Sequence, residues 1–147
     1  LGFDVVDDGS DNTGEAEEEG RRFARRCVGF ATNIQHRPVC VINGGEPVVR
    51  FTPGGDRGLG GRNQQFAVAA LDELWFGLGV EEKTAERIAI VSGGTDGEDG
   101  PTDAAGAVVD RTTVTRARQA GLDPDAVDVH ISGLAFRAPA ELPVVFG

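Results

Sequence analysis

Short apolar runs bounded by glycine, proline and polar residues predict several β-strands along this chain. These runs are Phe3–Val6, Val39–Ile42, Val48–Phe51 and Ile88–Val91. Pro38 introduces the second run, and Asn43-Gly44-Gly45 after it is typical of a turn. Ile88–Val91 is apolar at every position, which is typical of a buried strand in a parallel sheet.

Other segments space their apolar residues as amphipathic helices do. Glu15–Val28 begins with acidic residues and continues with arginines, an order that suits the helix dipole. Asn63–Leu78 is predicted as a second helix, and Thr112–Ala120 as a third that ends at Gly121. The apolar stripes are Phe23, Ala24, Cys27 and Val28 in the first helix and Phe66, Ala70, Leu74 and Leu78 in the second. Alternating strands and helices predict an α/β fold, with a layered, mostly parallel or mixed sheet flanked by helices.

The length of 147 residues is that of one ordinary domain, so residues 1–147 are expected to form a single unit. No apolar run approaches the roughly 20 residues of a membrane-spanning helix. The chain shows no charged-then-apolar leader of the secretory kind. A cytoplasmic protein without membrane contact is the expectation.

The formal net charge is −10 and the sequence pI is about 4.6. A field of that sign repels nucleic acid and anionic lipid, so neither is expected as a partner. Lys83 is the only lysine, and the other positive side chains are arginines. Acidic, lysine-poor composition favours a protein of a high-salt cytoplasm, where self-repulsion is screened. A GC-rich genome, which also favours arginine over lysine, is the alternative explanation.

Cysteine and histidine usage does not predict a structural zinc site. Cys27 and Cys40 have neither zinc-ligand nor redox spacing, and His36 and His130 lie far apart in the sequence. Both cysteines have apolar neighbours and are expected to be buried thiols.

The loop Gly93–Asp103, which follows an apolar strand, is the strongest candidate site. Asp96, Glu98, Asp99 and Asp103 place four carboxylates within eight residues, with Thr95 and Thr102 beside them. Ligands of open α/β sheets bind where loops leave the carboxyl ends of strands. Carboxylates with hydroxyls are hard oxygen ligands suited to Mg²⁺ carried with a phosphate. The spacing does not fit an EF-hand, because Gly100 and Ala107 stand where calcium ligands are required. A solvated acidic turn is the alternative.

Two further glycine-rich segments carry polar side chains. Gly60-Gly61-Arg62-Asn63-Gln64 leads into a predicted helix, where backbone N–H groups and the Arg62 guanidinium form a natural anion site. This segment is neither a P-loop nor a dinucleotide fingerprint. Asn43-Gly44-Gly45-Glu46 follows the strand Val39–Ile42 and pairs glycines with a carboxylate. A surface loop with a helix cap and a plain turn are the respective alternatives.

Taken together, these loops and the long motif Ser92–Asp110 resemble the MOFRL domain, the carboxy-terminal part of type II glycerate kinases. Members of that family are often called hydroxypyruvate reductases. The resemblance covers residues 1–125, whereas 126–147 read as a divergent or truncated tail. Family enzymes also have a large amino-terminal kinase domain across the active-site cleft, with a lysine expected in catalysis. Neither is found in these 147 residues.

The resemblance implies transfer of phosphate from ATP to the 2-hydroxyl of D-glycerate with Mg²⁺. The predicted catalytic residues are Arg62 and Asp96. The predicted substrate- or phosphate-binding residues are Gly44, Gly45, Glu46, Gly60, Gly61, Asn63, Gln64, Thr95 and Thr102. The predicted metal ligands are Asp96, Asp99 and Asp103.

We therefore expect a glycerate kinase domain that is inactive alone, with D-glycerate and ATP as the ligands of the parent enzyme. Its expected protein partner is the missing amino-terminal domain or a separately encoded subunit, and formation of a homodimer is a further alternative. The alternatives are a non-catalytic module that binds a phosphorylated metabolite or a partner, and part of a hydroxypyruvate reductase. The lack of a dinucleotide fingerprint counts against the last.

Overall fold

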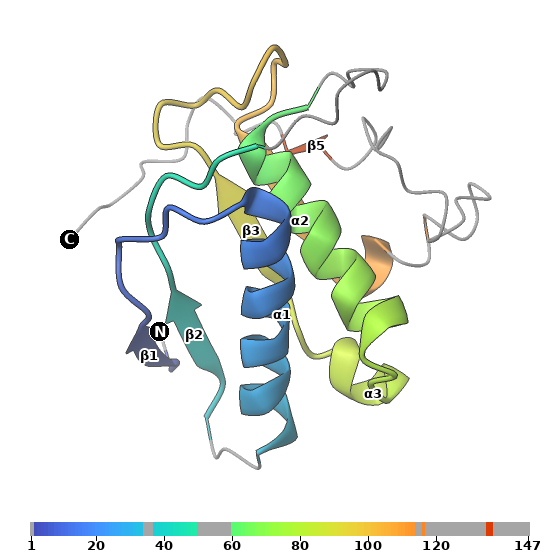
Figure 1. The fold of residues 1–147 in the computed structure, drawn as a ribbon. Coiled ribbons are helices and arrows are strands. Elements are labelled where there is room, and N and C mark those ends of the chain that lie inside the picture. Colours follow the sequence, from blue (N-terminus) through green and yellow to red (C-terminus); the bar gives the residue numbers. More distant parts are fainter. Residues whose placement is uncertain (1, 34–36, 50–59, 114–115, 117–134, 137–147) are drawn as a thin grey trace.

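Two small sheets flank a pair of packed helices in the computed structural model (Figure 1), which describes residues 2–33, 37–49, 60–113, 116 and 135–136. The first sheet pairs β1 (Asp4–Asp7) with β2 (Val39–Ile42) in parallel. The second has the antiparallel order β3 (Ile90–Gly93), β4 (Gly106–Val109), β5 (Ala135–Phe136). The helices are α1 (Ala16–Thr32), α2 (Arg62–Asp72) with its π-helical continuation η1 (Glu73–Gly77), and α3 (Glu82–Ala85). The predicted α/β class with a mixed sheet is confirmed.

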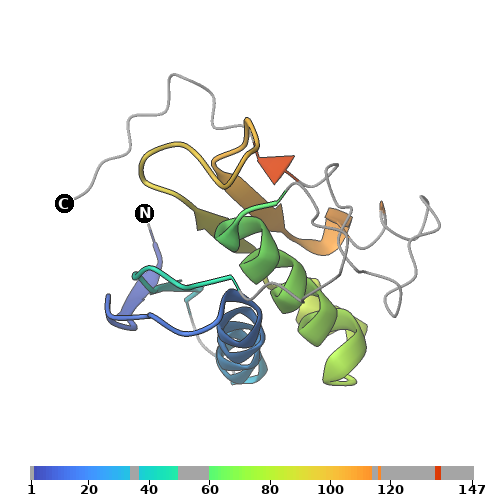
Figure 2. The same cartoon turned by 45° about the horizontal axis from the view of Figure 1, so that its top comes forward.

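The core lies where α1 crosses α2 and where α2 covers β3 and β4 (Figure 2). Gly20 permits the helix crossing, because a Cβ there would lie 2.2 Å from the carbonyl oxygen of Phe66. Next to it, the rings of Phe23 and Phe66 pack with centroids 5.8 Å apart. The buried core residues are Ala16, Ala24, Phe66, Ala67, Ala70, Leu71, Leu74, Ile88, Ile90, Ala107 and Val109.

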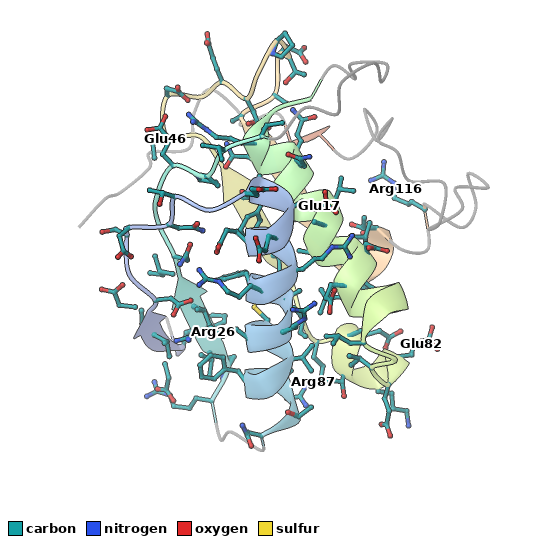
Figure 3. All side chains as sticks on the ribbon, viewed as in Figure 1. Glu17, Arg26, Glu46, Glu82, Arg87 and Arg116 are labelled. Carbon is teal, nitrogen blue, oxygen red and sulfur yellow. The ribbon has the colours of Figure 1, made fainter. Side chains whose placement is uncertain are left out.

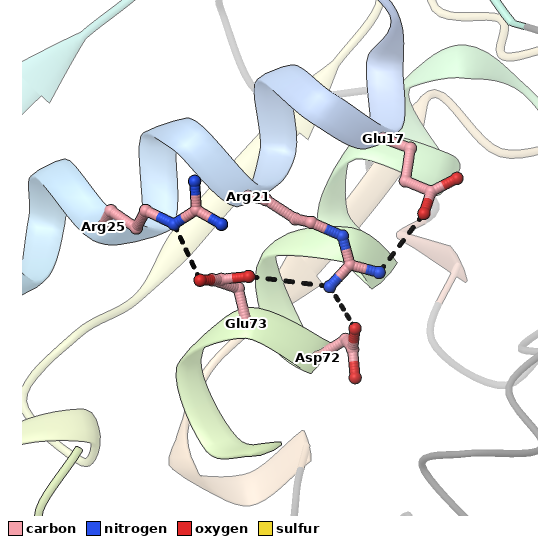
Figure 4. Close-up of polar contacts among 5 residues, drawn as sticks. All are labelled: Glu17, Arg21, Arg25, Asp72 and Glu73. Carbon is pink, nitrogen blue, oxygen red and sulfur yellow. Dashed lines mark hydrogen bonds and ion pairs between the residues drawn. The ribbon is translucent and has the colours of Figure 1, made fainter. Parts of the chain in front are cut away.

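Charged side chains join the two helices beside this core (Figure 4). Arg21 of α1 contacts Asp72 and lies 3.6 Å from Glu73, and Nε of Arg25 lies 2.7 Å from the same glutamate. Glu73 is 6% exposed, so its carboxylate needs these guanidinium partners to offset the cost of desolvation. The arginines that follow the acidic first turn of α1 therefore also fix how the helices pack.

The predicted helical stripes are confirmed except at one end. Phe23, Cys27 and Val28 pack against the core around the buried Ala24. Leu78, expected on the buried face of the second helix, is 37% exposed. The helical run ends at Gly77, and Gly79 adopts φ +57°, so the chain turns away before Leu78 can reach the core.

The strand expected at Ile88–Val91 is shifted, antiparallel and only half buried. It begins at Ile90 and pairs antiparallel with β4, which pairs antiparallel with β5 on its other side. Ile90 is 1% exposed whereas Val91 is 66% exposed, the alternation of a sheet with one covered face. The prediction failed because an all-apolar run does not reveal that its partner follows directly in the chain.

The turn at Asn43-Gly44-Gly45 does not return the chain as a hairpin. Gly45 and Val48 instead form isolated parallel bridges with Asn12 and Glu15. Within the described residues, the predicted strand Val48–Phe51 therefore appears only as one bridge, and its last two positions lie outside them.

The third predicted helix and the cysteines are partly corrected. Residues 111–113 and 116 are helical, and the rest of Thr112–Ala120 lies outside the described residues. Cys27 is half-buried, and burial raises the pKa of its thiol to about 11. Cys40, also expected to be buried, is exposed because its strand has one uncovered face. Among the described helices, none is long and apolar enough to span a membrane.

Candidate functional site

Helix α2 begins without a capping side chain of its own, because Gly61 occupies the N-cap position. The cap comes instead from Asp99 in the loop after β3. Its Oδ1 accepts the backbone N–H of Asn63 at 3.0 Å, and its Oδ2 accepts that of Gln64 at 2.8 Å. Asp99 is 2% exposed, so a buried carboxylate faces the positive end of the helix dipole. The predicted anion site at this helix end is thus filled by an anion of the chain itself.

Glycines make this close approach sterically feasible. A Cβ on Gly61 would lie 2.3 Å from Cγ of Asp99, and one on Gly100 would lie 2.6 Å from the carbonyl oxygen of Gly60. Gly100 also adopts φ +63°, which side chains rarely tolerate. The glycines of two loops that are remote in sequence therefore serve one contact, that of the acidic loop with the start of α2.

Asn63 and Gln64, predicted to bind substrate, hold the acidic loop against the helix. The amide of Asn63 donates to Oδ1 of Asp99 at 3.0 Å and accepts the hydroxyl of Ser92 at 2.9 Å. The amide of Gln64 donates to the hydroxyl of Thr102 at 3.0 Å. Thr102 in turn donates to the carbonyl of Asp99 at 2.8 Å. These side chains have partners inside the chain, and their predicted contact with substrate stays a prediction.

Arg62, the first residue of α2, points to the loop after β2. Its Nη1 lies 2.8 Å from Oε1 of Glu46, and the side chains are 42% and 76% exposed, respectively. Figure 3 places Glu46 on that loop, beside the start of α2. A pair this exposed contributes little to stability and can be exchanged for another ion. Arg62 is therefore held in position while its guanidinium stays accessible to an incoming anion.

The backbone around Glu46 is fixed by the loop after β1. The N–H of Glu46 donates to the carbonyl of Asn12 at 2.7 Å, and the amide of Asn12 donates to that of Asn43 at 3.2 Å. Gly45 has φ +142°, and a Cβ there would lie 2.2 Å from the carbonyl oxygen of Asn12. Gly44, also a predicted binding residue, donates its N–H to the carbonyl of Gly9 at 2.8 Å. Gly44 and Gly45 thus lie against the loop after β1.

The remaining predicted residues of the acidic loop face solvent. Thr95, Asp96 and Asp103 are exposed, and Gly97 turns the loop at φ +84°. Oδ1 of Asp96 accepts the N–H of Glu98 at 3.2 Å. In the described part of the chain, no group of three or more His, Cys, Asp or Glu side chains is arranged to hold a metal ion.

The structure thus brings the three predicted loops to one end of the molecule (Figure 1). Hydrogen bonds and the Arg62–Glu46 pair link them through the first turn of α2. Asn12, Asn43 and Ser92 also support the site, although the predicted site residues do not include them. Asn43 and Ser92 share a signal, a short polar side chain directly before a glycine, whereas Asn12 lies between Gly9 and Gly14 in the loop after β1.

Residues 39–142 match the MOFRL family. The chain belongs to this family. The MOFRL match runs past residue 125, where the resemblance was expected to end. A D-glycerate 2-kinase of Thermotoga maritima is 39% identical over 112 residues, which are 75% of this chain and 24% of that protein. An Agrobacterium vitis protein named "Putative hydroxypyruvate reductase" is 37% identical over 135 residues, 87% of this chain and 29% of its own.

A solved structure from Pyrococcus horikoshii is similar to this chain in fold. Its TM-score to this chain is 0.70 at 32% identity, over 85% of this chain and 27% of that one. This chain therefore spans about a quarter of the length of the curated relatives named above.

Proposed function

We propose that this chain forms one wall of the active site of a cytoplasmic glycerate kinase. The reaction transfers the γ-phosphoryl group of ATP to the 2-hydroxyl of D-glycerate. The hydroxyl oxygen bonds to the γ-phosphorus as the bond to the β,γ-bridging oxygen breaks; ADP leaves with that electron pair, and the hydroxyl proton passes to a base or to solvent. The observation that carries the proposal is the joining of three loops at the start of α2 around an accessible arginine.

Phosphoryl transfer depends on positioning and charge neutralisation more than on covalent groups of the protein. Arg62 supplies the positive charge, and its planar fork suits a phosphate or the glycerate carboxylate. The Glu46 carboxylate, 2.8 Å from that fork, holds it in place until an anion of the substrate replaces the glutamate. The backbone N–H groups of Asn63 and Gln64 already donate to Asp99, so Arg62 is the group that binds the anion of the substrate.

Mg²⁺ fits part of the acidic loop. This ion is usually held by one or two carboxylates together with substrate phosphates and water, and it neutralises their charge. Asp96 and Asp103 are exposed and suit such a partial ligand set. The buried Asp99 already accepts three N–H bonds, and we assign it to positioning α2 rather than to the metal.

Replacing Arg62 tests the proposal in a complete enzyme, a chimera in which this chain replaces the matched quarter of the Thermotoga kinase. Arg62→Ala is expected to lower kcat/KM for D-glycerate by about 100-fold, since it removes a charge that stabilises the transferring group. Arg37→Ala is the matched control, because Arg37 also forms an exposed pair, 3.5 Å from Asp4, away from the three loops. Equal kinetics of the two variants would refute the role of Arg62.

Calorimetry on the 147-residue chain separates a kinase half-site from a binding module. We expect ATP–Mg²⁺, D-glycerate and 2-phosphoglycerate to bind weakly or not at all at low and high salt. Tight binding of 2-phosphoglycerate alone, lost in Arg62→Ala, would instead favour a module that binds a phosphorylated metabolite.

The Agrobacterium relative's name makes hydroxypyruvate reduction the second candidate. The same chimera distinguishes the two activities. Consumption of NADH or NADPH with hydroxypyruvate, without ATP-dependent phosphorylation of D-glycerate, would favour reduction.

A further inference from the structure

The outer face of the β1–β2 pair is exposed and, apart from Asp7 at its end, apolar. Parallel register places Val5 beside Cys40 and Asp7 beside Ile42, and paired residues share a face. Phe3, two residues before Val5, lies on this face as well. Phe3, Val5 and Ile42 are 53%, 65% and 56% exposed, and Cys40 is exposed between them. We call Phe3, Val5, Cys40 and Ile42 the open face.

The opposite face of the same strands is covered. Val6 and Val41 are half-buried, and Asp8, which continues the alternation of β1, lies 2.7 Å from Nη2 of Arg26 in α1. Figure 3 shows Arg26 on the side of α1 that faces the strands. The connecting helix therefore packs on one face only, and the open face points away from it.

A parallel pair with one bare face departs from the usual arrangement. Parallel strands occur with helices on both faces, and a two-stranded sheet is only marginally stable by itself. Within the described residues, β1 and β2 pair only with each other. A contiguous apolar surface on such a sheet indicates a binding partner.

Two occupants of the open face are considered, a further segment of a longer polypeptide and a second copy of this chain. The length of the relatives and the net charge of this chain favour the first. The Thermotoga and Pyrococcus proteins match this chain over only 24% and 27% of their lengths, so most of their polypeptide lies outside the matched part. A second copy would instead bring together two chains that each carry a net charge of −10. It would also bring Asp7, which shares the face of Val5 and Ile42, close to Asp7 of the other copy.

We propose that the open face is the docking surface for an amphipathic helix from the part of the longer relatives outside these 147 residues. This helix covers the β1–β2 pair as α1 covers the other side. The proposal goes beyond the phosphotransfer proposal, and its test needs no turnover, so the two can fail separately.

Cys40 provides a reporter at the centre of the open face. In a Cys27→Ser variant of the 147-residue chain, Cys40 is expected to react with an aromatic disulfide reagent at the rate of an exposed thiol. In the Thermotoga chimera with the same substitution, the rate should fall by roughly tenfold or more, because the docked helix must open first. A chimera that also carries Cys40→Ser gives the background from other thiols.

Two matched substitutions locate the contact. Val5 and Val91 are 65% and 66% exposed, the first on the open face and the second on β3. Val5→Asp should restore Cys40 reactivity in the chimera, whereas Val91→Asp should not, and both should have equally small effects on the isolated chain. If the chimera does not fold, this chain is refolded together with the Thermotoga enzyme lacking its matched quarter, and the same rates are measured.

Equal Cys40 rates in the isolated chain and in the complete assembly would overturn the proposal. So would equal effects of Val5→Asp and Val91→Asp on those rates. Protection that rises with the concentration of the isolated chain, with sedimentation as a dimer, would also overturn it and identify a second copy as the occupant.

Discussion

Removing the carboxylate of Asp99 should destabilise the start of α2 more than any other change in the acidic loop. Asp99→Ala leaves two backbone N–H groups and the Asn63 amide without their acceptor. Loss of a helix N-cap costs about 1 kcal/mol and at most about 2. Hydrogen bonds to a charged group contribute roughly 1.5–3 kcal/mol. Because these contributions overlap, we expect a total loss of about 2–4 kcal/mol.

Urea unfolding followed by the fluorescence of Trp75, the only tryptophan, measures this loss. Trp75 packs partly buried against the core, so its emission should report global unfolding. At about 2–4 °C per kcal/mol for a chain of this size, the melting temperature should fall by roughly 4–16 °C. Asp99→Asn tests the charge, because an amide keeps the volume but offers one acceptor oxygen in place of two.

Asp96→Ala is the control, because Asp96 is an exposed aspartate of the same loop whose carboxylate accepts the N–H of Glu98. Its cost should stay within about 0.5 kcal/mol. If Asp99→Ala costs no more than Asp96→Ala, the capping role is wrong. Faster amide hydrogen exchange at Asn63 and Gln64 in Asp99→Ala would further assign the loss to this helix end.

Other features give equally direct tests. Gly61→Ala should cost about 1–3 kcal/mol by overpacking against the capping carboxylate, whereas Gly29→Ala, in α1 with no atom within 4 Å of the new Cβ, should be neutral or stabilising in the same urea titration. The hydrogen bond from Thr112, with others, lowers the pKa of Asp110, so the ionised Asp110 stabilises the fold above about pH 4, and this stabilisation is lost as pH falls through the lowered pKa. Asp110→Asn should therefore reduce the fall in melting temperature at acid pH. An unchanged profile of melting temperature from about pH 2 to 5 would contradict this role of Asp110. If the net charge of −10 reflects a high-salt cytoplasm, about 1 M KCl should raise the melting temperature by screening self-repulsion, and a salt-independent value would count against the halophile explanation.

The sequence marked the loops that meet at this end of the molecule, whereas the role of each residue there stays a prediction. Glycine pairs close to charged side chains marked Gly44–Glu46, Gly60–Gln64 and the acidic loop, and hydrogen bonds and an ion pair join all three. Two backbone segments can approach closely only where glycine leaves room, whatever ligand binds there. Glycine pairs therefore mark such loops in the sequence even when the fold is unknown.

The roles within the acidic loop depend on burial, which residue type does not reveal. Asp96 and Asp99 are the same amino acid three positions apart, yet one is exposed and the other is 2% exposed. An exposed carboxylate is accessible to a metal ion, whereas a buried carboxylate at a helix end accepts hydrogen bonds from the N–H groups there. The sequence could not predict that β3 pairs antiparallel with β4, because an apolar strand is compatible with a neighbour of either direction.

The hydrogen bonds inside the site define what this domain can contribute to phosphoryl transfer. Asn63, Gln64 and Asp99 are hydrogen-bonded to one another, so they hold the acidic loop against the start of α2. In the proposed reaction, Arg62 binds an anion and Asp96 a cation with its phosphates. Phosphoryl transfer needs such positioning and charge neutralisation, and the loops that carry these residues lie at one end of the molecule (Figure 1). A surface that leaves a guanidinium and a carboxylate accessible is suited to close against a second wall, and the open face of β1–β2 is where we expect the polypeptide that carries that wall to attach.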